Sequence, residues 1–178
     1  MARAMFFSAA EKASIPKTFS QAQRLISSHF KLSPYDWKMH PYDVRTLEQL
    51  ENHEVREGVF AYLCKYPSGA PENRARGGAP HFFRVCLQDG RILEAMGRGG
   101  SFIKFVPLML YIATHELIHI LRFSRGECDF ETPPEKRRTE EERVDDFTRC
   151  ILKPMKNPGL RLVIDCFGDE YRIGDLIN

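Results

Sequence analysis

The stretch LMLYIATHELIHILRF, residues 108–123, is apolar on nearly every side. It predicts a long buried helix that begins between Ser101 and Pro107 and ends near Phe123, with Gly126 as the stop signal. Inside this helix His115 and His119 are four residues apart, so they lie about 40° apart and one turn along the axis. Two imidazoles placed in this way can hold one metal ion, while the carboxylate of Glu116 points beside them toward a water on that ion.

The apolar surroundings of these residues also favour a metal. A buried, unpaired carboxylate costs several kcal/mol, and each buried imidazole needs hydrogen-bond partners. The neighbouring side chains of this helix are aliphatic and supply few such partners. A metal ion satisfies all three polar groups at once, so the pattern favours a metal site over two core histidines and a stray glutamate.

A third protein ligand is expected from a second helix, TEEERVDDFTRCIL, residues 139–152. Thr139 and Glu142 form a T-x-x-E capping box that sets its predicted start. Glu141 and Asp145 flank its inward face, whereas Glu142 faces solvent, and Glu140 also falls close to the inward face. Geometry alone therefore leaves Glu140 and Glu141 as competing ligands. The inward face consists of Val144, Phe147, Thr148, Ile151 and Leu152.

HELIH followed by E-x-x-V-D, with 21 residues between His119 and Glu141, resembles the gluzincin metallopeptidases, the thermolysin-like clan. The longer run E-x-x-V-D-D-F-T-x-x-I-L-x-P also resembles a run in their small intracellular members. The resemblance implies that His115, His119 and Glu141 bind Zn²⁺ and that Glu116 is the general base. It also implies that Asp145 orients a ligand histidine from behind. The chain departs from the family pattern at Val144 and Thr148, where the family has a small residue and an alanine.

The resemblance implies an intracellular zinc-dependent peptidase, in which a metal-activated water attacks the peptide bond of a peptide or protein substrate. The alternative is a zinc-containing binding or regulatory protein of the same fold that does not turn over peptides. In the clan, an edge strand ahead of the motif helix binds substrate, and Phe83–Leu87 or Arg91–Met96 is in the corresponding place here. A histidine or tyrosine stabilises the oxyanion in the clan, and Tyr171 is the candidate.

The rest of the chain predicts an α+β, zincin-like fold, with a small twisted sheet packed on the HELIH helix and the second helix. The expected unit is a single domain over residues 1–178, with a mainly helical part (1–57), a metal-site core (58–152) and a tail (153–178). The expected local elements are helices at 18–30 and 44–55, a turn at 33–37, a strand at 58–66, an exposed loop at 67–80, a hairpin of 81–87 and 91–96 around Gln88-Asp89-Gly90, and a hairpin or strand and turn in 160–176.

Composition bounds the remaining possibilities. Lys+Arg 26 and Asp+Glu 24 leave a net charge of +2 in 178 residues, which argues against nucleic-acid and membrane surfaces as partners. The five cysteines include no C-x-x-C pair, so they predict no disulfide framework and mostly small buried side chains. A short apolar N-terminus without a secretory core predicts a cytoplasmic protein. Charges within residues 102–123 argue against a membrane span there, and the oligomeric state stays open.

Overall fold

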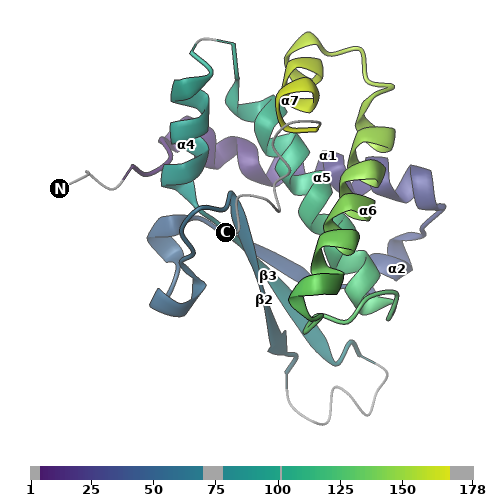
Figure 1. Cartoon of the computed structure of the whole chain (residues 1–178). Coiled ribbons are helices and arrows are strands. Elements are labelled where there is room, and N and C mark those ends of the chain that lie inside the picture. The colour runs from purple at the N-terminus through teal and green to yellow at the C-terminus, as the bar shows by residue number, and fades with distance from the viewer. Residues whose placement is uncertain (1–4, 70–77, 101, 169–178) are drawn as a thin grey trace.

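The protein, described here from a computed structural model that covers residues 5–69, 78–100 and 102–168, has a mixed α+β architecture. Figure 1 shows helices grouped around a small three-stranded sheet. The helices are α1 (Ala9–Phe30), α2 (Pro34–Met39), α4 (Asp89–Arg98), α5 (Phe105–Ser124), α6 (Pro134–Leu152) and α7 (Pro158–Gly168), with 3₁₀ turns η1 (Leu47–Gln49) and η2 (Asn52–Glu54), and the strands are β1 (Tyr42–Arg45), β2 (Ala61–Pro67) and β3 (His81–Leu87).

Helix α5 is the centre of the molecule, as its all-round apolar sequence predicts. It packs against α1, α6, α7 and strand β2, and Figure 1 shows it between α1 and α6. Every residue from Leu108 to Arg122 is buried. The helix begins and ends within the predicted limits, and Gly126, with φ 69°, follows it as the predicted left-handed stop.

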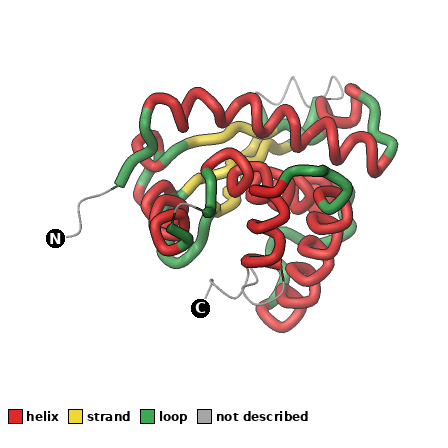
Figure 2. Tube along the Cα trace, turned by 90° about the horizontal axis from the view of Figure 1, so that it is seen from above, coloured by secondary structure: helices red, strands yellow, loops and turns green. Residues whose placement is uncertain are grey.

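The sheet has strand order β1-β3-β2, with β1 parallel and β2 antiparallel to β3. Its inner face is apolar: Val85 is fully buried, and the ring of Phe83 stacks on Phe123 of α5 with centroids 6.2 Å apart. Figure 2 shows that the strands run together as one small group and that helices make up most of the molecule. This sheet places β2, one of its two edge strands, next to α5.

Strand β1 and the two 3₁₀ turns occupy residues 42–54, where the sequence predicted a helix over 44–55, so that prediction was wrong. Val44 pairs with Val85 in the sheet, and this tertiary pairing outweighs the local helical preference. The side chains of Gln49 and Glu54 accept hydrogen bonds from the backbone N–H groups of Thr46 and Glu51, so each closes a single turn.

The predicted second hairpin strand, Arg91–Met96, lies in helix α4, so the Asp89-Gly90 pair does not form a hairpin turn. The carboxylate of Asp89 instead accepts hydrogen bonds from the backbone N–H groups of Phe7 and Leu47, at 3.1 and 2.9 Å. Ile92 and Ala95 are buried three residues apart, which is a helical spacing. Long-range contacts of Asp89 therefore override the turn signal.

Several further boundaries differ from those predicted. Helix α1 begins at Ala9 rather than near Thr18, and strand β2 spans Ala61–Pro67 rather than 58–66. The segment at 33–37 begins helix α2, capped by Ser33. Helix α6 begins at Pro134 rather than Thr139, because proline suits the first helical position, and Thr139 lies inside the helix instead of capping it. Helix α7 replaces the extended tail expected from residue 160 on, with Leu160, Val163 and Ile164 buried at helical spacing. The remainder of the predicted tail lies outside the described residues.

Candidate metal centre

Helix α5 places the two histidines of HELIH on one side of the helix, one turn apart, where they face each other. Their Nε2 atoms are 3.1 Å apart, and the exposed fractions of the two residues are 1% for His115 and 5% for His119. The ring of His119 also stacks on Phe123 at 5.5 Å. Because both rings are buried, the helix packing holds the two nitrogens close together.

Helix α6 supplies a carboxylate to the same point. Oε2 of Glu141 is 3.2 Å from Nε2 of His115 and 3.2 Å from Nε2 of His119. The three atoms thus form a triangle with sides of 3.1–3.2 Å. Tetrahedral ligands about 2.0–2.1 Å from zinc are about 3.3 Å apart, so the triangle is close to the size that zinc requires. His115, His119 and Glu141 lie close enough to bind one metal ion.

Asp145 stands behind His115, one helical turn after Glu141. Its Oδ1 is 3.1 Å from Nδ1 of His115, and neither atom has another hydrogen-bond partner among the described residues. A carboxylate in this position fixes the ring and favours the tautomer whose Nε2 is free to accept a metal. Glu141 thus faces both histidines, and Asp145 faces His115.

Electrostatics at this cluster favour the charged forms of both partners. Burial lowers the pKa of His115, but the hydrogen bonds and negative charges of Asp145 and Glu141 outweigh it and raise that pKa well above its ordinary value. Burial raises the pKa of Glu141, but the His119 charge and both histidine contacts outweigh it and lower that pKa far below its ordinary value. The carboxylates of Glu141 and Asp145 and the imidazoles therefore stabilise one another's charged forms.

Glu116 lies beside the two histidines but does not share their point of convergence. It is 5% exposed and lines the same cleft as His115, His119 and Glu141. Burial, the largest effect, raises the pKa of Glu116 above its ordinary value despite the nearby histidines. A buried carboxyl group at the wall of a cleft is suited to proton transfer.

Glu140, the other ligand candidate in the sequence, forms an ion pair with Arg122 instead of contacting the histidines. Both its oxygens bind Arg122 of α5, at 2.5 Å from Nε and 3.1 Å from Nη2, and the two side chains are 7–8% exposed. Nη1 of Arg122 also donates to Glu127 at 2.6 Å. Sequence reasoning missed Arg122, although a lone arginine in an apolar helix signals a buried carboxylate partner.

The cleft at the cluster has a volume of about 410 Å³ and is bordered by β2, α5 and the segment between α5 and α6. A larger groove of about 850 Å³ lies between α1, α2 and β1, away from all three convergent residues. The smaller cleft is the candidate site because it alone, of these two, contains the metal-ligating side chains. Comparison with known protein families, curated proteins and solved structures gives no match to this chain.

Tyr171, the predicted oxyanion-stabilising residue, lies outside the described residues. Two arginines, Arg56 and Arg137, line the cleft and bring positive charge to it. Within the described ranges, none of the helices is long and apolar enough to cross a membrane, α5 included.

Proposed function

We propose that the protein is a zinc-dependent peptidase with a zincin-like arrangement of its metal-binding helices. The proposal rests on the convergence of His115, His119 and Glu141, whose three ligand atoms are 3.1–3.2 Å apart. They lie at the wall of a cleft that is also lined by Glu116. Two imidazoles and one carboxylate with room for a water are the donor set of catalytic zinc sites. Zinc, when bound, supplies Lewis-acid polarisation of a carbonyl and a lowered pKa of water.

Two further residues have roles in the proposed reaction. Glu116, buried beside the histidines, takes a proton from the attacking water and delivers it to the leaving amine. Asp145, 3.1 Å from Nδ1 of His115, keeps that ring in the orientation and tautomer required of a ligand. The sequence resemblance to gluzincins assigns the same roles to these positions.

The shape of the cleft supports an extended peptide as substrate. Strand β2 is an edge strand of the sheet, and its residues Ala61, Tyr62 and Leu63 line the cleft. The backbone of such an edge strand can bind a peptide by adding it to the sheet. This replaces the strands expected from the sequence, because Phe83–Leu87 lies in the central strand and Arg91–Met96 in a helix.

Glu116→Gln tests the catalytic role, with Glu135→Gln as the matched control on the exposed start of α6. Because glutamine keeps the size of the side chain but cannot accept the proton, we expect wild-type zinc content and a rate of peptide cleavage lowered by about 10²–10⁴. The control should keep full activity. Cleavage of a broad peptide library is followed by mass spectrometry.

Two results would contradict the proposal. Equal cleavage by wild type and Glu116→Gln would assign the activity to another site or to a contaminant. Stoichiometric zinc in wild-type protein with no cleavage of any peptide would instead support the alternative, a zinc-containing binding or regulatory protein.

A further inference from the structure

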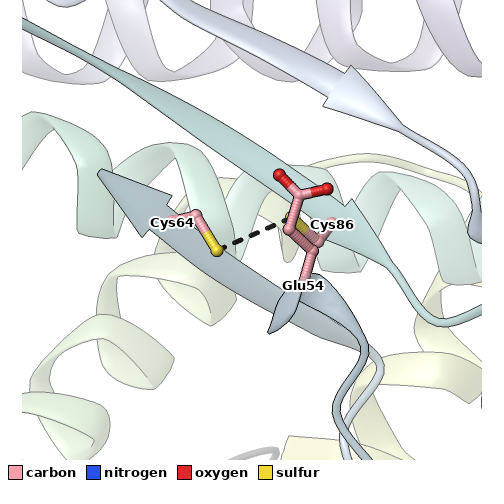
Figure 3. A group of neighbouring side chains, drawn as sticks. All are labelled: Glu54, Cys64 and Cys86. Carbon is pink, nitrogen blue, oxygen red and sulfur yellow. Dashed lines mark hydrogen bonds between the residues drawn. The ribbon is translucent and has the colours of Figure 1, made fainter. Parts of the chain in front are cut away.

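A second cluster of metal-ligating side chains lies on the outer face of the sheet, separate from the cleft. It consists of Glu54 from η2, Cys64 from β2 and Cys86 from β3, whose ligand atoms all lie within 4.8 Å of one another. Figure 3 shows the two sulfurs pointing toward each other across neighbouring strands, with Glu54 reaching over them from its turn. Glu54 and Cys86 are fully buried and Cys64 is half-buried.

The cysteines are less buried than the sequence predicted. All five are free, as predicted, but Cys86 alone is buried, whereas Cys150 and Cys166 are exposed. Cys64 and Cys86 are diagonal neighbours in the sheet, since Cys64 pairs with Arg84 and Cys86 with Tyr62. Both therefore face the same side of the sheet by register, with the buried Glu54 above them.

The separation of the sulfurs distinguishes two chemistries. The Sγ atoms of Cys64 and Cys86 are 4.0 Å apart, about twice the S–S length of a disulfide. Two thiolates about 2.3 Å from a tetrahedral zinc ion are about 3.8 Å apart. Binding a metal requires the sulfurs to move by a few tenths of an ångström, whereas a disulfide requires diagonal strand neighbours to approach by about 2 Å and also needs an oxidant.

The charges around the cluster also favour a bound cation. Two thiolates and the carboxylates of Glu54 and Asp43 carry four negative charges, which a divalent cation and the guanidinium groups of Arg84 and Arg45 balance. Arg84 is 2.9 Å from oxygens of both carboxylates, and Arg45 is 3.5 Å from Asp43. Oε1 of Glu54 also accepts from the hydroxyl of Tyr66 at 2.6 Å, and Oε2 accepts from the backbone N–H of Glu51 at 3.0 Å. A carboxylate has about four lone-pair positions, so one remains for a metal.

We propose that Cys64, Cys86 and Glu54 form a second, structural site for a thiophilic divalent cation, zinc or cadmium. The cation fastens the turn η2 to strands β2 and β3. Because β2 also borders the cleft through Ala61 and Leu63, the site stiffens the strand that faces the candidate metal centre. This inference is independent of the peptidase proposal.

Cobalt titration of the reduced full-length chain tests the site, because Co²⁺ bound to thiolate has a near-ultraviolet charge-transfer band that histidine and carboxylate ligands do not produce. We expect wild-type protein to develop this band as Co²⁺ is added up to two equivalents, one for each cluster. Cys64→Ser and Cys86→Ser should each lose it while still binding cobalt at the histidine cluster. Cys128→Ser, a thiol that lines the cleft, and Cys150→Ser, an exposed thiol, are controls that should keep it.

A second measurement uses wild-type protein alone, so it does not depend on the folding of any variant. Zinc should protect the half-buried Cys64 from alkylation at least tenfold, as followed by mass spectrometry, while the exposed Cys150 reacts at an unchanged rate. Absence of the cobalt band in wild type, its persistence in Cys64→Ser, or equal alkylation of Cys64 with and without zinc would overturn the proposal. None of these readouts depends on peptidase activity.

Discussion

Adjacent glutamates on α6 should have opposite roles, which makes Glu140→Gln and Glu141→Gln an informative pair. Glu140 neutralises the buried Arg122, and both side chains are 7–8% exposed. Removing one partner of a buried ion pair costs about 3–5 kcal/mol. For Glu140→Gln the loss in the free energy of unfolding should be about 3 kcal/mol, because Arg122 keeps its hydrogen bond to Glu127 and the glutamine side chain still offers a carbonyl acceptor. For a chain of this length, that lowers the Tm by about 6–12 °C.

Glu141 should determine whether metal binds. Its Oε2 is 3.2 Å from both imidazoles, so Glu141→Gln removes one of three ligands. Zinc at about 100 times its Kd stabilises a folded protein by about 2.7 kcal/mol, a rise in Tm of about 5–11 °C at this length. We expect that rise in wild type and in Glu140→Gln, but not in Glu141→Gln.

Thermal unfolding of the three proteins, each with a chelator and with zinc, measures both effects in one experiment. Calorimetric zinc titration gives the affinities directly. The reasoning is refuted if zinc raises the Tm of Glu141→Gln but not that of Glu140→Gln, because the buried carboxylate beside Arg122 would then be the ligand. Equal Tm values for Glu140→Gln and wild type in chelator would refute the assigned role of the Arg122 pair.

Two further perturbations have defined outcomes. Asp145→Asn should weaken zinc binding about 10- to 100-fold in calorimetry, because the group that orients His115 is lost; unchanged affinity would exclude that role. Burial, followed by the charge of Arg125, lowers the pKa of His40 below its ordinary value. A histidine whose pKa is lowered in the folded state stabilises the fold above the unfolded pKa of about 6.5, and this stability is lost as pH falls. Between about pH 7.5 and 5.5, the free energy of unfolding measured in urea should therefore fall less for His40→Gln than for wild type. Equal falls in the two proteins would contradict this prediction.

The sequence predicted those parts of the molecule in which chemistry and local pattern coincide. Helix α5 is apolar all round, so its burial and its limits followed from residues within it. His115 and His119 needed only the helical repeat to be placed together. The geometry expected for Glu141 and Asp145 also followed from one helix, because their spacing puts both carboxylates on the side that faces α5.

The sheet was less predictable, because its strands are stabilised by residues far away in the chain. Val44 joins the sheet through Val85, 41 residues later in register. The Asp89-Gly90 pair predicted a hairpin turn, yet the carboxylate of Asp89 accepts hydrogen bonds from the backbone N–H groups of Phe7 and Leu47. Local preference was correct about neither segment, since pairing and side-chain contacts over long separations decide both.

The choice between Glu140 and Glu141 shows where pattern reasoning ends and packing begins. Both lie near the inward face of α6, and they differ in what α5 presents opposite each of them: Arg122 to Glu140, the two imidazoles to Glu141. A cation among aliphatic residues requires a buried anion, so Arg122 takes one glutamate and leaves the other free to approach the histidines. The ion pair thus accounts for which of the two neighbouring glutamates reaches the histidines, although it does not itself contact the metal ligands.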